Sequence, residues 1–367
     1  MEEKEMTREE KVSRVKELVR ILDEASRAYY VENLTNIMAT KQRIFYFDVL
    51  RTFAIIAVII CHVDHFFGPL TTNPQIIAQM TFHDIGRIGV PIFLMISGAL
   101  LLNRDYELSS FIKRRFTRII YPCIFWFILI AITSLLFKRT SAYIWSVFIG
   151  EPSIMWYFWT LIGIYLFIPV LNTFIREYEL KGCEYFLAIW FFTMVLKTFS
   201  TYPLLPHLDL SYFAGYVGYP VLGYYLANKK FNFTDKQMCV LGFVILLIFL
   251  SVFVYLDFNK TGHVSLIYQN VPIIFMGSGV FLFVKYLDEI NAFDKIKDNI
   301  VGKAILSISM CSYGMYFSHV IVLKFVELIN PHSTLLFPVM FALIVFLSWL
   351  APYVLSKIPY VKYVSGV

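Results

Sequence analysis

Charged residues are scarce in this chain of 367 residues, and clustered cysteines are missing. Asp, Glu, Lys and Arg together make up 16% of the sequence, whereas about a quarter is usual in soluble domains. The five cysteines are scattered along the chain, without a Cys-x-x-Cys pair or a Cys/His cluster. We therefore interpret them as small apolar residues and expect no disulfide, no metal site and no permanently bound cofactor. No internal repeat is visible, so an inverted-repeat transporter gains no support.

Apolar residues are abundant instead. They make up 58% of the chain, with 36 Phe and 24 Tyr. Ten apolar segments have about the length that crosses a bilayer, and three of them (the second, fifth and sixth) are short. The segments are 44–67, 88–103, 119–137, 154–172, 185–199, 212–227, 238–256, 271–287, 304–328 and 335–356.

The positive charges indicate an orientation for these segments. With the N-terminus inside, eighteen Lys and Arg residues fall on the inner side, and only Arg87, Lys138, Arg139 and Lys260 fall outside. This asymmetry follows the positive-inside rule. The sequence thus predicts an all-α, polytopic membrane helix bundle of about ten transmembrane helices, multi-pass in the cell membrane, with both termini cytoplasmic.

The first 43 residues form a separate cytoplasmic extension, and residues 44–367 form the transmembrane domain. Thr7 and Glu10 have the spacing of a capping box, and apolar residues at helical spacing predict an amphipathic helix over about 8–30. The stretch KELVRILDEASRAYYVENLTNIMAT resembles the first helices of bacterial NAD-dependent DNA ligases over about 25 residues. Residues that follow in those ligases are missing, so we predict a surface-lying or partner-binding helix rather than ligase activity.

The first apolar segment contains two ionisable residues, Arg51 and His62. Eleven helical steps separate them by roughly 16 Å along the axis. Such residues inside a span usually mark a functional site. Other interpretations remain: Arg51 can reach the interface or pair with Asp48, and His62 can be satisfied by a backbone carbonyl. Asp64 and His65 follow closely as polar neighbours.

A second basic group begins the third segment. Arg115 and Arg118 share one helix face at the predicted inner surface, beside Arg114. Together with Arg51 they could form a positively charged binding site for a polyanion. Alternatively, they could simply fix the orientation of the helices in the membrane.

Further candidates lie in the second, fourth and ninth segments. His319, with Tyr316 nearby, has about the same predicted depth as His62, so the two rings could face one another; a structural histidine is an equal alternative. Ser97 and Gly98 are expected to let helices approach closely. Trp156, Tyr157 and Trp159 are typical of an interfacial aromatic belt, and a sugar-stacking platform is the alternative. We interpret His83 and Asp84 as solvated loop residues.

Several motifs resemble those of the membrane-bound acyltransferase-3 family, which includes O-acetyltransferases of surface polysaccharides. Arg51 and His62 match an Arg-x10-His pattern in LRTFAIIAVIICH, and Arg115 and Arg118 match Arg-x-x-Arg. Further matches are GVPIFLMISG, MWYFWTLIGIYLFIPVL, SYGMYFSH and IPYVKYVSG, in order over residues 44–367. The N-terminal extension is a departure from most members, and the appended extracytoplasmic domain of some members is missing.

The resemblance implies transfer of an acyl group, usually acetyl, from cytoplasmic acyl-CoA to a hydroxyl of a surface or cell-wall glycan or its lipid-linked precursor. It implies that His62 acts as the general base, and it leaves open an acyl-histidine intermediate. It also implies that Arg51, Arg115 and Arg118 bind the phosphates of CoA. His319, Tyr316, Asp64 and Trp156 are possible acceptor-binding or supporting residues.

Membrane lipids are expected partners and nucleic acid is not, and the chain can form a homo-oligomer. Two other functions stay open. One is an exporter of a polysaccharide or lipid-linked sugar without acyl transfer, and the other is a membrane anchor that recruits a partner through its N-terminal helix.

Overall fold

The computed structural model describes residues 17, 43–63, 72–150, 155–199, 210, 213–259, 270–328, 337–359 and 361–367. Apart from residue 17, the helix predicted over 8–30 lies outside these residues, and so do Asp64 and His65. Contacts divide the chain after Ile44 into two units, of which Phe45–Val367 is the larger.

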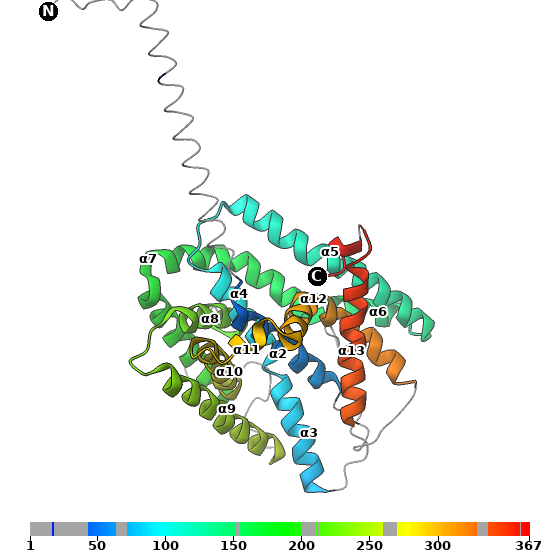
Figure 1. Cartoon of the computed structure of the whole chain (residues 1–367). Helices are drawn as coiled ribbons and strands as arrows, with labels where there is room; N and C mark the ends of the chain where they lie inside the picture. The colour runs from blue at the N-terminus through cyan, green and yellow to red at the C-terminus, as the bar shows by residue number, and fades with distance from the viewer. Residues whose placement is uncertain are drawn as a thin grey trace, which may run out of the picture. The chain divides into compact units, whose positions relative to one another are not determined.

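The described part of this unit contains helices and no strand, which confirms the all-α prediction (Figure 1). The α-helices are α2 (Phe45–Val63), α3 (Asn73–Gly86), α4 (Gly89–Leu101), α5 (Leu108–Leu136), α6 (Ser141–Ile149), α7 (Met155–Phe199), α8 (Gly218–Asn228), α9 (Asp235–Phe258), α10 (Val271–Glu289), α11 (Asp294–Lys297), α12 (Ile300–Val326) and α13 (Phe337–Leu355). The described residues also contain two short 3-10 helices, η3 (Gly215–Val217) and η4 (Val361–Tyr363).

Eight helices in the described residues are long and apolar enough to cross a membrane, when α3 and α4 are taken together. Each of the ten predicted apolar segments overlaps a helix. Two of them fall in α7, which bends at Glu179, where φ is 50° and ψ is −136°. Another is α8, whose 11 residues are too few to cross alone. The chain is therefore a polytopic helix bundle.

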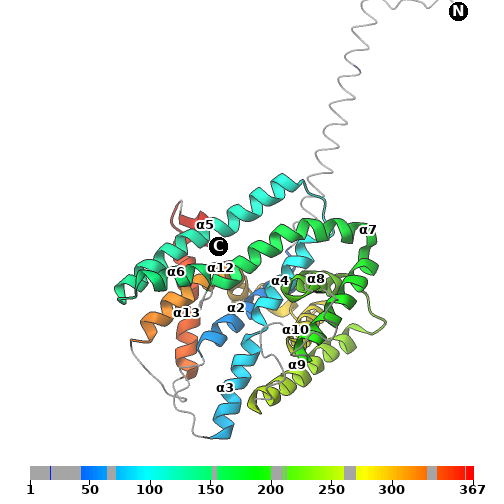
Figure 2. The same ribbon diagram turned by 180° about the vertical axis from the view of Figure 1, so that it is seen from behind.

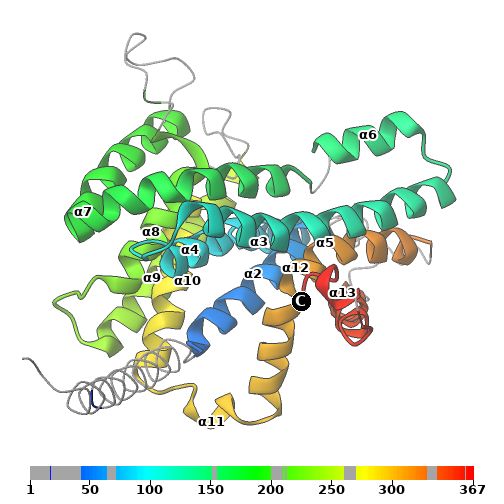
Figure 3. The same ribbon diagram turned by 90° about the horizontal axis from the view of Figure 1, so that it is seen from above.

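Helix α2 lies at the centre of the bundle. It packs against α3, α4, α10 and α12. Figure 2 shows it among these helices, and Figure 3 shows it between α10 and α12. The Thr52 hydroxyl donates a hydrogen bond of 3.0 Å to the Ile305 carbonyl and joins α2 to α12. By contrast, α9 and α13 leave apolar side chains such as Val240, Leu247 and Phe346 at the surface, as expected where a span meets lipid.

Glycines allow α4 and α8 to approach at backbone distance. A Cβ atom on Gly98 would collide with the Pro220 backbone, and one on Gly223 would collide with the Met95 backbone. The expectation that Gly98 serves close helix packing is therefore confirmed.

Candidate functional site

The imidazole rings of His62 and His319 meet inside the bundle. Their centroids are 5.1 Å apart and their planes are inclined by 59°. His62 lies one residue before the end of α2, and His319 lies in the second half of α12, the helix against which α2 packs. The similar depth inferred from the sequence thus corresponds to a direct ring contact.

Both rings are oriented by their own helices. The Nδ1 of His62 lies 2.7 Å from the Val58 carbonyl oxygen, and the Nδ1 of His319 lies 3.0 Å from the Met315 carbonyl oxygen. A carbonyl oxygen only accepts hydrogen bonds, so Nδ1 carries the hydrogen in each ring and Nε2 of the neutral ring is an acceptor. His319 is fully buried, and its Nε2 has no hydrogen-bond partner among the described residues. In the neutral form of each ring, Nε2 is therefore the nitrogen with an accepting lone pair.

A row of aromatic rings leads away from this histidine pair. Tyr316 lies 6.2 Å from His319 between ring centroids, and Tyr157 lies 5.3 Å from Tyr316. Trp156 continues the row, at 6.1 Å from Tyr157 and 5.6 Å from Tyr216. The aromatic-belt interpretation is wrong for Tyr157, because this side chain is only 5% exposed and packs in the core.

Arg51 lies near a buried carboxylate. Its Nη1 is 3.4 Å from Asp48 Oδ1, and the Ser309 hydroxyl of α12 donates a 2.6 Å hydrogen bond to the same oxygen. The Arg51 side chain keeps 31% of its surface exposed, whereas the Asp48 side chain keeps 1%. Asp48 therefore links α2 to α12 and holds one guanidinium at the N-terminal end of α2.

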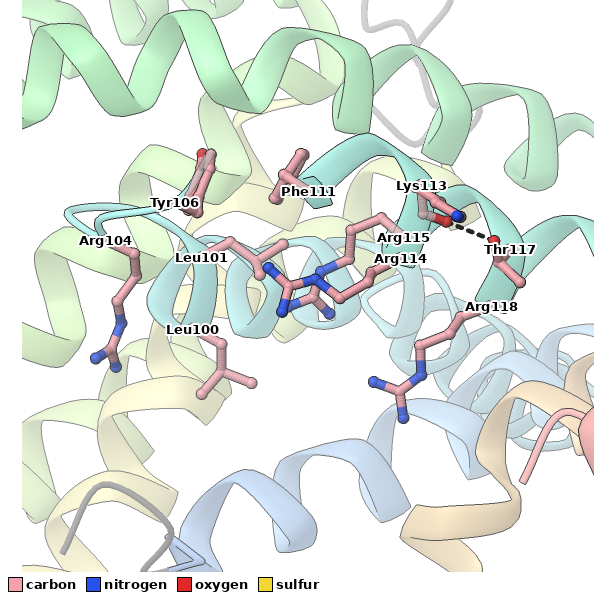
Figure 4. A pocket seen from close by; sticks show the side chains of 10 residues that line it. All are labelled: Leu100, Leu101, Arg104, Tyr106, Phe111, Lys113, Arg114, Arg115, Thr117 and Arg118. Atoms are coloured by element: carbon pink, nitrogen blue, oxygen red, sulfur yellow. Dashed lines mark hydrogen bonds between the residues drawn. The ribbon is translucent and has the colours of Figure 1, made fainter. Parts of the chain in front are cut away.

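A basic pocket of about 590 Å³ opens where α4 turns into α5. Figure 4 shows the guanidinium groups of Arg114 and Arg115 between those of Arg104 and Arg118. The other lining residues are Leu100, Leu101, Tyr106, Phe111, Lys113 and Thr117. Burial raises the pKa of Tyr106, which keeps its phenol neutral among these cations. Five of the ten lining residues are cationic and none is acidic, which gives the pocket the charge that suits an anion.

Residues 44–355 match the family model of an acyltransferase domain, the acyltransferase-3 family. The chain belongs to this family. No curated protein and no solved structure gives a significant match. Family membership and the apolar helices together make the chain a multi-pass membrane acyltransferase.

The basic pocket of this acyltransferase contains two of the three arginines predicted to bind a polyanion. Arg115 and Arg118 line it, whereas Arg51 is not among the lining residues. Sequence reasoning missed Arg104 and Lys113 as site residues. The sequence does contain a signal for these two residues, because both lie in the most basic of the predicted inner loops. We applied that signal only to the orientation of the helices in the membrane.

One hydrogen bond relates the pocket of the acyltransferase to its histidine pair. The Tyr313 hydroxyl of α12 donates to the Ile119 carbonyl of α5, at 2.9 Å and next to Arg118. From Tyr313, six helical steps lead to His319, roughly 9 Å along the axis. This hydrogen bond therefore joins α5, which carries Arg118, to α12, which carries His319.

The prediction that His83 and Asp84 are solvated loop residues is wrong. Both belong to α3, and Asp84 is fully buried. The stretch is too polar to qualify as a span by itself, which is why it was assigned to a loop. Packing of α3 against α2 and α9 buries one of its faces.

Proposed function

We propose that the chain is a membrane O-acyltransferase that moves an acyl group, most simply acetyl, from acyl-CoA to a hydroxyl of a glycan. The acceptor class is a surface or cell-wall glycan or its lipid-linked precursor. The observation that carries this proposal is the ring contact of His62 with His319, in which a main-chain carbonyl holds Nδ1 of each histidine.

The basic pocket is the proposed donor site. The phosphates of CoA are a compact polyanion, and planar guanidinium groups such as those of Arg115 and Arg118 bind phosphate oxygens in pairs. With both termini in the cytoplasm, the turn between α4 and α5 faces the cytoplasmic pool of acyl-CoA. The flexible pantetheine arm would then extend along α12 toward the histidine pair. Arg51 would add a cation outside the pocket lining.

His62 is the proposed general base. Its Nε2 takes the proton of the acceptor hydroxyl while the hydroxyl oxygen forms a bond to the thioester carbonyl carbon. The carbon–sulfur bond then breaks, and the departing CoA sulfur takes the proton from Nε2. The products are the O-acyl glycan and CoA with a free thiol. His319, whose ring contacts that of His62, supports the reaction by orienting either His62 or the acceptor.

The alternative step is attack by His62 Nε2 itself on the thioester carbonyl, which would give an acyl-histidine before transfer. The two routes differ in one observable. Incubation with labelled acetyl-CoA and no acceptor leaves label on the protein only in the acyl-histidine route, so rapid acid quenching separates them.

The aromatic row is the proposed path of the acceptor. Trp156 is half-buried and contacts Tyr216, and the rings of Tyr157 and Tyr316 connect this pair to His319. Sugar rings stack on such aromatic faces, and the row would guide a sugar hydroxyl toward the histidines.

Mass spectrometry of cell-envelope glycans, from cells with and without the gene, tests the proposed function. We expect an acyl mass shift that is present with the gene and absent without it or with His62→Ala. Loss of the glycan from the surface, with no mass shift in what remains, would instead favour the exporter.

A further inference from the structure

Asp84 is a buried carboxylate within a candidate membrane span. Its side chain is 0% exposed, and neither carboxylate oxygen has a hydrogen-bond partner among the described residues. Arg87 Nε and His83 Nδ1 lie 3.8 Å and 3.9 Å from Oδ1, which is beyond hydrogen-bond distance. Burying a carboxylate without hydrogen bonds is costly, and ionisable residues inside spans usually mark functional sites. Such a group therefore points to a ligand.

Asp257, at the end of α9, completes a cluster around this carboxylate. One ligand atom each from His83, Asp84 and Asp257 lies within 4.8 Å of the other two. The cluster joins two helices, because α3 packs against α9. With both carboxylates ionised and the imidazole neutral, His83, Asp84, Arg87 and Asp257 together carry a net negative charge. A cation would compensate that charge.

The donor set fits a zinc ion. Zinc binds imidazole nitrogen and carboxylate oxygen, and sites with three protein ligands keep a fourth position for water. Zinc–ligand bonds of 2.0–2.2 Å place tetrahedral ligand atoms about 3.4 Å apart. The three atoms would therefore have to close by about an ångström, and this movement would fall to His83 and Asp257, which are only partly buried. We propose that His83, Asp84 and Asp257 bind one Zn²⁺ and so tie α3 to α9.

This cluster borders the end of α2 that carries His62. The Cys61 thiol donates to the His83 carbonyl at 3.2 Å, and a Cβ atom on Gly86 would meet the Cys61 and Ala57 backbones. Zinc bound at His83 would therefore fix the segment against which this end of α2 packs. The proposal does not depend on acyl transfer, since it concerns binding of the metal alone.

Zinc titration of the purified full-length chain in nanodiscs tests the proposal. After dialysis against a chelator, ZnCl₂ is added in competition with a chromophoric chelator. We expect one Zn²⁺ per chain. Asp84→Asn and His83→Gln should each weaken binding by more than about 100-fold, because loss of outer-shell partners alone costs 10–100-fold. Asp294→Asn is the matched control, since this carboxylate is 57% exposed and pairs with Lys297 at 3.1 Å.

Two outcomes of the titration would overturn the proposal. One is the absence of stoichiometric zinc binding by the parent chain, which would leave Asp84 and Arg87 as a structural ion pair. The other is parental affinity in Asp84→Asn.

If the Asp84 variant does not fold, two other measurements still decide whether the cluster binds zinc. Asp257→Asn, at a less buried ligand, should also lose zinc. X-ray absorption at the zinc edge of the parent should show nitrogen and oxygen ligands with one imidazole. A sulfur ligand would place the ion on cysteines and contradict the proposal.

Discussion

At the scale of single residues, the main-chain hydrogen bonds of the two histidines decide their chemistry. Because the Val58 and Met315 carbonyls hold Nδ1 of His62 and His319, Nε2 is the accepting nitrogen of each neutral ring. Asp48 acts in a comparable way on Arg51, which is held near a carboxylate that Ser309 also contacts. The Arg-x10-His pattern therefore positions two side chains that are each fixed by neighbouring backbone or side-chain groups.

Arg115 should contribute to donor binding more than an exposed arginine elsewhere. Arg115→Ala should weaken acetyl-CoA binding by about 1.5–3 kcal/mol, the usual range for hydrogen bonds to charged groups. Arg115→Lys should restore part of the loss, because Lys lacks the planar fork. Calorimetry on the purified protein measures both. Arg176→Ala, which removes an exposed pair with Asp105 outside the pocket lining, is the control.

The same titration with Arg51→Ala separates its two possible roles. A loss of affinity would place this guanidinium on the donor as well. Unchanged affinity would leave Arg51 as the partner of Asp48 only. If both the Arg115 and the Arg51 variants bind acetyl-CoA with the affinity of the parent protein, these basic residues only orient the helices in the membrane.

At the scale of helices, the contact between α4 and α8 depends on two glycines. Gly98→Leu should destabilise the fold by about 1–3 kcal/mol or more, because the new side chain meets the Pro220 backbone, which cannot rotate away. Thermal melting in detergent measures the change. Gly163→Leu is the control, since no heavy atom lies within 4 Å of a Cβ built there. Equal melting temperatures for the two variants would contradict the close approach.

The helices that sequence could predict are those with continuous apolar character. α3 was missed because its residues are mixed in polarity, although the Thr72 backbone N–H donates to the Gln75 side chain at 3.2 Å, a local start signal. The similar depth of His62 and His319 made their contact one of the alternatives, and the packing of α2 against α12 decides it. The burial of Asp84 and Tyr157 could not be predicted from the sequence, since it arises from packing between helices far apart in the chain.

At the scale of the whole molecule, the orientation in the membrane remains a prediction from the positive-inside rule. We expect positions 115 and 230 to face the cytoplasm, and positions 207 and 260 to face the outside. Single cysteines introduced at these positions, labelled with a membrane-impermeant reagent in intact and opened cells, give the side directly. Labelling of position 207 from the cytoplasmic side alone would overturn the ten-span order and the cytoplasmic donor.

Acyl transfer at the histidine pair can be measured directly with purified proteins. Parent, His62→Ala and His319→Ala proteins in nanodiscs are given labelled acetyl-CoA and a glycan acceptor, with donor binding and thermal melting measured alongside. We predict that His62→Ala folds, binds acetyl-CoA and loses transfer by about 10²–10⁴-fold, as expected for loss of a general base. His319→Ala should lose less. Full transfer by folded His62→Ala would contradict the proposed mechanism.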